Sequence, residues 1–286
     1  MKKENSIFYQ KKTINCGGYL LNIEKPIVMG ILNTTPDSFY DGGLYKTDKE
    51  VLDKVNLMIK EGAAIIDIGA QSTRPKADFI SVEEELLRLI PVLKLIRKEH
   101  PLMPISIDTF HSKVAVEAII EGASIINDIS GGMMDDMMFE TIAEYKVPYI
   151  LMHIQGTPKT MQDNPTYENV VIEIMDYFVH KLHALKRLGV NDIIIDLGFG
   201  FGKNVEHNYE LLKKLSLFKM LDCPILCGFS RKSMINKVLN TKPAEALNGS
   251  TVLNTIALLN GAEIIRTHDV KEAMEAIKIV DYIQNI

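Results

Sequence analysis

The sequence predicts a (β/α)8 barrel preceded by a short N-terminal hairpin. Eight short apolar runs recur along the 286-residue chain, and a loop and an amphipathic helical stretch follow each run. The runs are rich in Ile and Val and do not alternate with polar residues, which is typical of parallel strands buried on both faces. Eight such units at this length favour a closed barrel. An open, doubly wound sheet is the alternative interpretation.

The predicted elements begin with the hairpin. In residues 1–26, the turn residues NCGG separate IFYQKKTI from YLLNI, and we expect this hairpin to close the lower end of the barrel. The barrel domain is then predicted over residues 27–286. Its strands are expected at Ile27–Leu32, Ile65–Ile68, Ile105–Ile107, Ile125–Ile126, Tyr149–Met152, Ile193–Asp196, Ile225–Cys227 and Ile264–Arg266.

Helix signals lie between the strand runs. Ser81, followed three residues later by Glu84, predicts a capping box at the start of one helix. Pro91 is expected to kink that helix or to mark a break in it. A later helical stretch is expected to end at Gly189, after basic residues in its last turns. The stretch KEAMEAIKIVDYIQ closes the chain as a further helix.

Composition argues against several classes of protein. The net charge is −5 and no basic stripe is found, so nucleic-acid binding is not expected. No apolar run approaches the roughly 18 residues that span a membrane, and the N-terminus lacks the apolar segment of a signal peptide. Three cysteines, an odd number, suit a reducing cytoplasm. Cys223 and Cys227 are interpreted as buried thiols, because no third metal ligand lies near them in sequence.

Polar side chains gather immediately after the predicted strands. The active site of a (β/α)8 barrel lies at the carboxyl ends of its strands, so we expect these side chains to meet in space. The positions hold acids, amides, hydroxyls and cations: Asn33, Thr34, Asp37, Asp67, Thr73, Arg74, Asp108, Asn127, Asp128, His153, Asp196, Lys232, Ser233, Arg266 and His268. A binding or catalytic site is therefore predicted at this end.

Some of these residues also have a purely structural interpretation. Asp67 and Asp128 are each expected to bond loop amides rather than a ligand. Asp108, which precedes Thr109, is open to a role as the cap of the next helix. The run GFGFGK lacks the spacer and the Ser or Thr of a Walker A loop, so its two phenylalanines are candidates for the core.

A resemblance to a known family rests on motifs that occur in order: GILNTTPDSFYDGG, DIGAQSTRP, SIDTF, NDISGG, LMHIQGTPKTMQ, DLGFGFGK, GFSRKS and IRTHDV. These motifs closely resemble those of the dihydropteroate synthases, over nearly the whole chain from Ile27 to Asp281. The family condenses (7,8-dihydropterin-6-yl)methyl diphosphate with 4-aminobenzoate, and the products are 7,8-dihydropteroate and diphosphate. The resemblance therefore implies a transferase of folate biosynthesis and a target for sulfonamides.

The resemblance implies a pterin pocket deep in the barrel. Carboxylates there accept paired hydrogen bonds from the donor edge of the flat ring. Arg266 matches an arginine that stacks on the pterin face, a contact that lysine does not reproduce. The implied pterin-binding residues are Asp108, Asn127, Met152, Asp196, Gly228, Lys232 and Arg266, and the implied catalytic residues are Asp108, Lys232, Arg266 and Arg74.

Two further subsites and a cofactor follow from the same resemblance. Asn33 matches a ligand of Mg²⁺, an ion that takes oxygen ligands. The implied diphosphate contacts are Asn33, Thr73, Arg266 and His268, and the implied aminobenzoate contacts are Phe39, Thr73, Arg74, Pro75, Phe201, Lys232 and Ser233. The implied mechanism is dissociative, since the arylamine attacks after diphosphate leaves. Family members are commonly homodimers, so a homodimer that binds these small molecules, but no nucleic acid or membrane, is expected.

Two alternatives come from other classes. A methyltetrahydrofolate corrinoid methyltransferase shares a pterin-binding barrel, but it does not need the NTTPDSF and STRP loops that are present here. A non-catalytic pterin-binding protein would keep Asp108 and Asp196 and lose residues such as Asn33 or Arg74, and none of these is lost. One departure from the family concerns Lys76, where glycine is common, and it leaves the sulfonamide response open.

Overall fold

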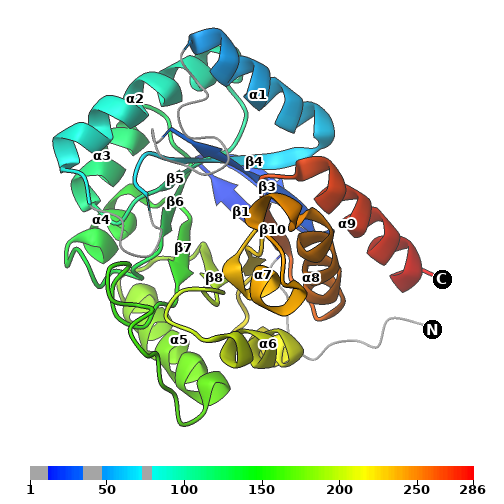
Figure 1. The fold of residues 1–286 in the computed structure, drawn as a ribbon. Coiled ribbons are helices and arrows are strands. Elements are labelled where there is room, and N and C mark those ends of the chain that lie inside the picture. Colours follow the sequence, from blue (N-terminus) through cyan, green and yellow to red (C-terminus); the bar gives the residue numbers. More distant parts are fainter. Residues whose placement is uncertain (1–11, 35–46, 73–78) are drawn as a thin grey trace.

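The structure, a computed structural model, describes residues 12–34, 47–72 and 79–286. Parallel strands close into a barrel in the order β10-β3-β4-β5-β6-β7-β8-β9, and helices ring the strands (Figure 1). The barrel strands are β3 (Ile27–Asn33), β4 (Ala63–Gly69), β5 (Ile105–Asp108), β6 (Ile125–Asp128), β7 (Tyr149–Met152), β8 (Ile193–Asp196), β9 (Ile225–Cys227) and β10 (Ile264–Thr267). The closed barrel confirms the predicted fold and excludes the open sheet.

The helices of the described residues cover the outside of the barrel. They are α1 (Asp48–Glu61), α2 (Val82–Glu99), α3 (Ser112–Ile120), α4 (Met138–Tyr145), α5 (Val170–Arg187), α6 (Val205–Lys213), α7 (Ser233–Leu239), α8 (Leu247–Leu259) and α9 (Val270–Gln284), with short 3-10 helices at Leu215–Leu221 and Pro243–Glu245. Their apolar faces pack on strand residues that point outward, such as Ile66, Ile107 and Ile195. None of the helices in the described ranges is long and apolar enough to span a lipid bilayer.

The sequence signals at helix ends are largely confirmed. Ser81 caps α2, because its hydroxyl accepts the backbone N–H of Glu84 at 3.2 Å; this is one half of the predicted capping box, and the described residues do not show the return bond from the Glu84 side chain. The helix is continuous from Val82 to Glu99, so the break considered at Pro91 is wrong. Helix α5 ends at Arg187, and Gly189 then adopts a positive φ of 85°, as expected for the glycine that follows a helix.

The N-terminal hairpin closes the lower end of the barrel. Strands β1 (Thr13–Cys16) and β2 (Tyr19–Asn22) pair antiparallel across a Gly17–Gly18 turn. The hairpin side chains Ile14, Cys16, Leu21 and Ile23 form one apolar cluster with inward-facing residues of the barrel strands. Burial of that cluster holds the hairpin against the amino ends of the strands, which confirms the predicted placement.

Candidate active site

The interior of the barrel changes from apolar to polar along its strands. Residues two apart on a strand point to the same side. The lower inner layer is apolar and consists of Met29, Ile65, Ile125, Ile150, Ile194, Leu226 and Ile264. Two positions after the last six of these stand Asp67, Asn127, Met152, Asp196, Gly228 and Arg266. The alternation therefore brings these residues together inside the barrel, at the carboxyl ends of the strands.

Two other predicted residues join this inner upper layer. Ile105 and Ile107 belong to the outer core, so Asp108, one position further along β5, faces the interior. Asn33 ends β3, four residues after inward-facing Met29. The alternative that Asp108 caps the next helix is wrong, because α3 begins after His111.

Arg266 is the central cation of the inner layer. Its Nε donates to Asp67 Oδ2 at 2.7 Å, and its Nη2 donates to Asp108 Oδ2 at 2.7 Å. Asn127 Nδ2 donates to the same Oδ2 of Asp67 at 3.2 Å. Asp67 was expected to bond loop amides, and this expectation is wrong, since its partners are two side chains of the candidate site. Its place two residues after Ile65 is the signal that would have revealed this.

Asp128 has the structural role that was expected. It follows Asn127 on β6, so its side chain points outward, away from the barrel interior. Its carboxylate accepts the backbone N–H groups of Ser130 at 2.7 Å and Gly132 at 2.8 Å and the hydroxyl of Tyr149 at 2.7 Å. These bonds shape the loop between β6 and α4.

Burial and neighbouring charges set the protonation of the inner carboxylates. Burial, together with repulsion from Asp67, raises the pKa of Asp108 to about 7, although Arg266 acts in the opposite direction. Burial also raises the pKa of Asp196, against the attraction of Lys232 and Arg266. For Arg266, burial alone would lower the pKa, but Asp67 and Asp108 outweigh burial and raise it. The interior therefore carries a fixed positive charge among carboxylates whose charge responds to pH.

Lys232 approaches this layer from the start of α7. Its Nζ donates to the carbonyl oxygen of Phe199 and lies 4.7 Å from the centre of the Phe201 ring. Burial lowers the pKa of Lys232 to about 8, while Asp196 opposes the shift. Ser233 is the first residue of α7. Phe199 is part of the core, whereas Phe201 is only partly buried and faces Lys232.

A second polar group spans the ends of β3 and β10. Asn33 Nδ2 lies 3.2 Å from His268 Nε2, and the other ring nitrogen, Nδ1, lies 3.0 Å from the hydroxyl of Ser230. Ser230 also accepts the backbone N–H of His268 at 3.3 Å. Because the amide nitrogen of Asn33 faces His268, its oxygen Oδ1 is the atom available to a ligand. Sequence reasoning missed Ser230, which the GFSRKS motif contains.

Several predicted residues cannot be placed in this site. Phe39, Thr73, Arg74 and Pro75, and also Asp37 and Lys76, lie outside the described residues. Thr34, at the start of the first of these segments, donates its backbone N–H to the carbonyl of Gly69 at 2.9 Å. That bond ties the end of β3 to the end of β4.

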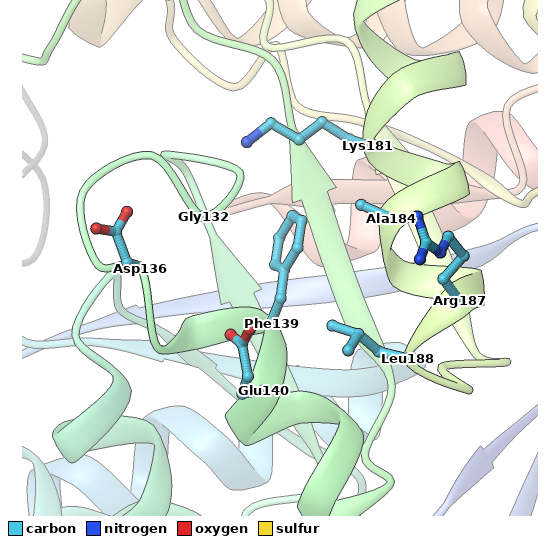
Figure 2. Close-up of a pocket in the computed structure, with 8 residues that line it drawn as sticks. All are labelled: Gly132, Asp136, Phe139, Glu140, Lys181, Ala184, Arg187 and Leu188. Carbon is cyan, nitrogen blue, oxygen red and sulfur yellow. The ribbon is translucent and has the colours of Figure 1, made fainter.

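A cavity of about 380 Å³ lies elsewhere, between α4 and α5 on the outside of the barrel (Figure 2). It is lined by Gly132, Asp136, Phe139, Glu140, Lys181, Ala184, Arg187 and Leu188. None of the predicted site residues lines it. The inner polar layer, rather than this cavity, is therefore the candidate active site.

Comparisons with known proteins point to one family. Residues 29–268 match the family of pterin binding enzymes. The chain is 46% identical over 266 residues to the dihydropteroate synthase of Escherichia coli (strain K12). This alignment covers 92% of this chain and 94% of that protein. It is 41% identical over 261 residues to the dihydropteroate synthase of Haemophilus influenzae, covering 91% of this chain and 94% of that protein.

Solved structures agree with the sequence relatives. The dihydropteroate synthase of Yersinia pestis in complex with a sulfonamide drug superimposes with a TM-score of 0.92 at 40% identity, covering 96% of this chain and all of the other. The enzyme of Thermus thermophilus in complex with 4-aminobenzoate gives a TM-score of 0.85 at 34% identity, covering 94% of this chain and 99% of the other.

Proposed function

The chain belongs to the dihydropteroate synthase family of pterin binding enzymes, and from this membership we propose which of its residues carry out the reaction. The reaction joins a dihydropterin-methyl diphosphate to 4-aminobenzoate and releases diphosphate. The observation that carries the assignment of residues is the polar inner layer above an apolar barrel floor. Neither a corrinoid methyltransferase nor a non-catalytic binding protein accounts for the agreement with the synthases over 92% of the chain.

The pterin ring binds in the inner layer. Asp108 and Asp196 accept from the donor edge of the ring, while Asn127 and Lys232 contact its other polar atoms. Met152 and Gly228, the inward residues at the ends of β7 and β9, border the pocket; glycine at 228 leaves room for the flat ring. Each hydrogen bond to a charged group contributes about 1.5–3 kcal/mol, so this set of contacts accounts for selective binding.

Arg266 stacks on the pterin while it stays bonded to the two carboxylates. Its bonds to Asp67 and Asp108 use N–H groups that lie in the plane of the guanidinium. The flat face of the guanidinium is therefore left for an aromatic ring. The two carboxylates hold that plane in a fixed orientation, which a lysine at this position would not provide.

The diphosphate lies at the barrel mouth against Asn33, Thr73, Arg266 and His268. Asn33 Oδ1 supplies one oxygen ligand for Mg²⁺, an ion that takes its remaining ligands from phosphate oxygens and water. The donor chemistry fits Mg²⁺, because the polar groups here are the amide of Asn33, the imidazole of His268 and the hydroxyl of Ser230, rather than thiols. Mg²⁺ bound there would withdraw charge from the departing diphosphate.

The aminobenzoate occupies the outer part of the mouth. Phe201, Lys232 and Ser233 form one wall of its site, and Phe39, Thr73, Arg74 and Pro75 supply the rest. Diphosphate loss leaves a cation at the methylene carbon, and the carboxylates of Asp108 and Asp196 stabilise it through their negative potential. The neutral arylamine then attacks that carbon, and no protein nucleophile is needed.

The role of Asn33 is tested by Asn33→Ala. The variant should need about tenfold more Mg²⁺ for half of its maximal rate, while its affinity for a pterin without diphosphate stays unchanged. Asn56→Ala, which alters an exposed asparagine of α1, is the matched control. An unchanged Mg²⁺ requirement in Asn33→Ala would remove this residue from the metal site.

A homodimer is also part of the proposal. Helices α7, α8 and α9 are neighbours (Figure 1). They carry exposed apolar side chains: Val238, Leu239, Val252, Ile256, Leu259, Ile279, Tyr282 and Ile283. An apolar surface of this kind suits a two-fold interface between identical copies. Val252→Asp should raise the dissociation constant measured by sedimentation, whereas Leu87→Asp, at a more exposed leucine of α2, should not. Equal behaviour of both variants would argue against this face.

The domain boundaries and the compartment are proposals as well. Residues 1–26 act as an extension that stabilises the barrel floor, and residues 27–286 form the pterin-binding domain. No disulfide links Cys16, Cys223 and Cys227, all of which lie in the described residues, and this supports work in a reducing cytoplasm.

A further inference from the structure

The central part of the loop between β8 and α6 is held by hydrogen bonds from side chains. Five consecutive backbone carbonyls, those of residues 198–202, each accept a hydrogen bond from a side chain. The donors are Lys203 for Gly198, Lys232 for Phe199, Gln162 for Gly200, Lys203 again for Phe201 and Tyr167 for Gly202. A segment in which five consecutive carbonyls are bonded in this way has a fixed shape.

Lys203 is the innermost of these donors. Its side chain is 2% exposed, and its Nζ lies 2.9 Å from the carbonyl oxygens of Gly198 and Phe201. It lies 3.0 Å from His153 Nδ1, so the three closest acceptors match the three N–H groups of a lysine. Within the described part of the chain, Lys203 forms no ion pair with a carboxylate. Burial of an amino group without an ion-pair partner costs free energy, so a specific role for Lys203 is expected.

The same loop contacts the pterin site. Gly198 donates its N–H to Asp196 Oδ1 at 2.8 Å, and this bond orients the carboxylate. The next residue, Phe199, offers its carbonyl to Lys232, and the ring of Phe201 lies beneath the Lys232 amino group. The carbonyls of Gly198 and Phe201 therefore face Lys203, while the carbonyl of Phe199 faces Lys232 in the candidate site.

The loop also presses closely on the end of β7. A Cβ on Gly198 would lie 1.9 Å from the carbonyl oxygen of His153, so only glycine fits there, and its φ of 66° is also one that glycine adopts readily. Such close contact leaves the amino group of Lys203 enclosed between His153 and the loop. Without that group, the carbonyl of Phe201 and the Nδ1 atom of His153 would lose their donor, and the carbonyl of Gly198 would keep only the backbone N–H of Phe201.

We propose that Lys203 is a positioning residue of the synthase, which acts on the pterin through Lys232 and Asp196. It holds the β8–α6 loop in the shape that orients the Asp196 carboxylate and fixes the Lys232 amino group over Phe201. Lys203 itself touches no substrate. The inference rests on the proposed contacts of Lys232 and Asp196 with the pterin ring.

The test is a double-mutant cycle on pterin affinity, measured by calorimetry. Lys203→Met removes the donors at similar length, and it should raise the Kd for pterin about tenfold. In a Lys232→Met background the same change should raise the Kd by clearly less than tenfold, because the part of its effect that passes through Lys232 is already lost and only the part through Asp196 remains. A general loss of stability would act equally in both backgrounds. The matched control is Lys181→Met. Lys181 is a half-buried lysine of α5 that lies over the ring of Phe139, and its replacement should leave the Kd for pterin unchanged.

The outcomes separate the two proposals. If Lys232→Met alone leaves the Kd unchanged, the proposed pterin contact of Lys232 is wrong. If Lys232→Met weakens binding but Lys203→Met behaves like Lys181→Met or acts equally in both backgrounds, the positioning role is wrong and the pterin site stands. Lys203→Gln keeps two N–H donors and serves in the same cycle if Lys203→Met does not fold. Failure of both variants to fold would assign Lys203 to folding alone and overturn the inference.

Discussion

Arg266 contacts one oxygen of Asp67 from two of its nitrogens, Nε at 2.7 Å and Nη2 at 2.6 Å. The other oxygen of Asp67, Oδ1, is buried, and no described residue bonds to it. A buried acceptor without a partner is uncommon and is usually satisfied by a ligand or an ordered water. Asp67 therefore anchors Arg266 through one oxygen and leaves the other oxygen as an acceptor that faces no donor of the described residues.

Asp67→Asn should weaken pterin binding about tenfold or more, because Arg266 loses a charged partner worth about 1.5–3 kcal/mol. Calorimetry with a pterin is the measurement. Asp53→Asn, at an exposed aspartate of α1, serves as control. An affinity equal to that of the unaltered protein would show that Arg266 does not depend on Asp67 for its orientation.

Asp196→Asn should also weaken pterin binding, because the amide presents a donor where the ring presents donors of its own. The expected loss is about 1.5–3 kcal/mol in the free energy of binding. Circular dichroism confirms that the variant is folded before its affinity is measured. Unchanged affinity in a folded variant would exclude Asp196 from the site.

Pterin affinity should fall as the pH rises through about 8. Burial, opposed by Asp196, lowers the pKa of Lys232 to about 8, so the lysine is charged below this pH and loses its charge above it. The charged lysine donates the stronger hydrogen bond. The Kd measured from pH 6.5 to 9.5 should rise in the upper half of this range, and Lys232→Met should remove that rise. A Kd that stays constant to pH 9.5 would place the Lys232 pKa higher or its amino group away from the ring.

Glu85 offers a test of stability that is separate from the site. Its side chain is 1% exposed, and burial raises its pKa to about 7, although the side chain of Thr109 opposes the shift. His111 Nε2 lies 4.0 Å away, but burial lowers the pKa of His111, so it stays neutral at neutral pH. The folded state thus holds the proton of Glu85 more tightly than the unfolded state, and stability is lost as pH rises from about 4.5 through 7.

The free energy of unfolding of Glu85→Gln, compared with that of the unaltered protein at the same pH, should therefore increase from pH 5 to pH 8. The rise in pKa from 4.5 to about 7 sets an upper limit of about 3 kcal/mol on that gain. Urea unfolding at the two pH values measures it, with the exposed Glu99→Gln at the end of α2 as control. A difference in unfolding free energy that does not change with pH would mean that Glu85 is already charged in the folded state.

The fold was predictable because the apolar runs and helix signals each point to the same architecture. The strands extend one or two residues beyond their apolar runs, as at Asp108 and Asp128, because backbone pairing continues into the polar residues at the barrel mouth. Pro91 did not interrupt α2, since packing of Leu89 and Leu93 in the core outweighs the loss of one helical hydrogen bond.

The candidate site was predictable in its residues more than in its contacts. The alternation along β4 and β6 separates Asp67, which faces inward, from Asp128, which faces outward, although both were given the same structural interpretation. The role of Lys203 depends on the path of the GFGFGK loop, and no periodicity in the sequence encodes that path. Such contacts form between strands that are distant in sequence, so only the closed barrel reveals them.

The central claim is that the polar inner layer binds the pterin, and a crystal structure with a pterin diphosphate analogue and Mg²⁺ tests it most directly. The account predicts the ring between Asp108, Asn127, Asp196 and Lys232, with the face of Arg266 against it and the ion beside Asn33 Oδ1. A pterin bound in the outer cavity between α4 and α5, with the inner layer left to water at saturating ligand, would contradict the account.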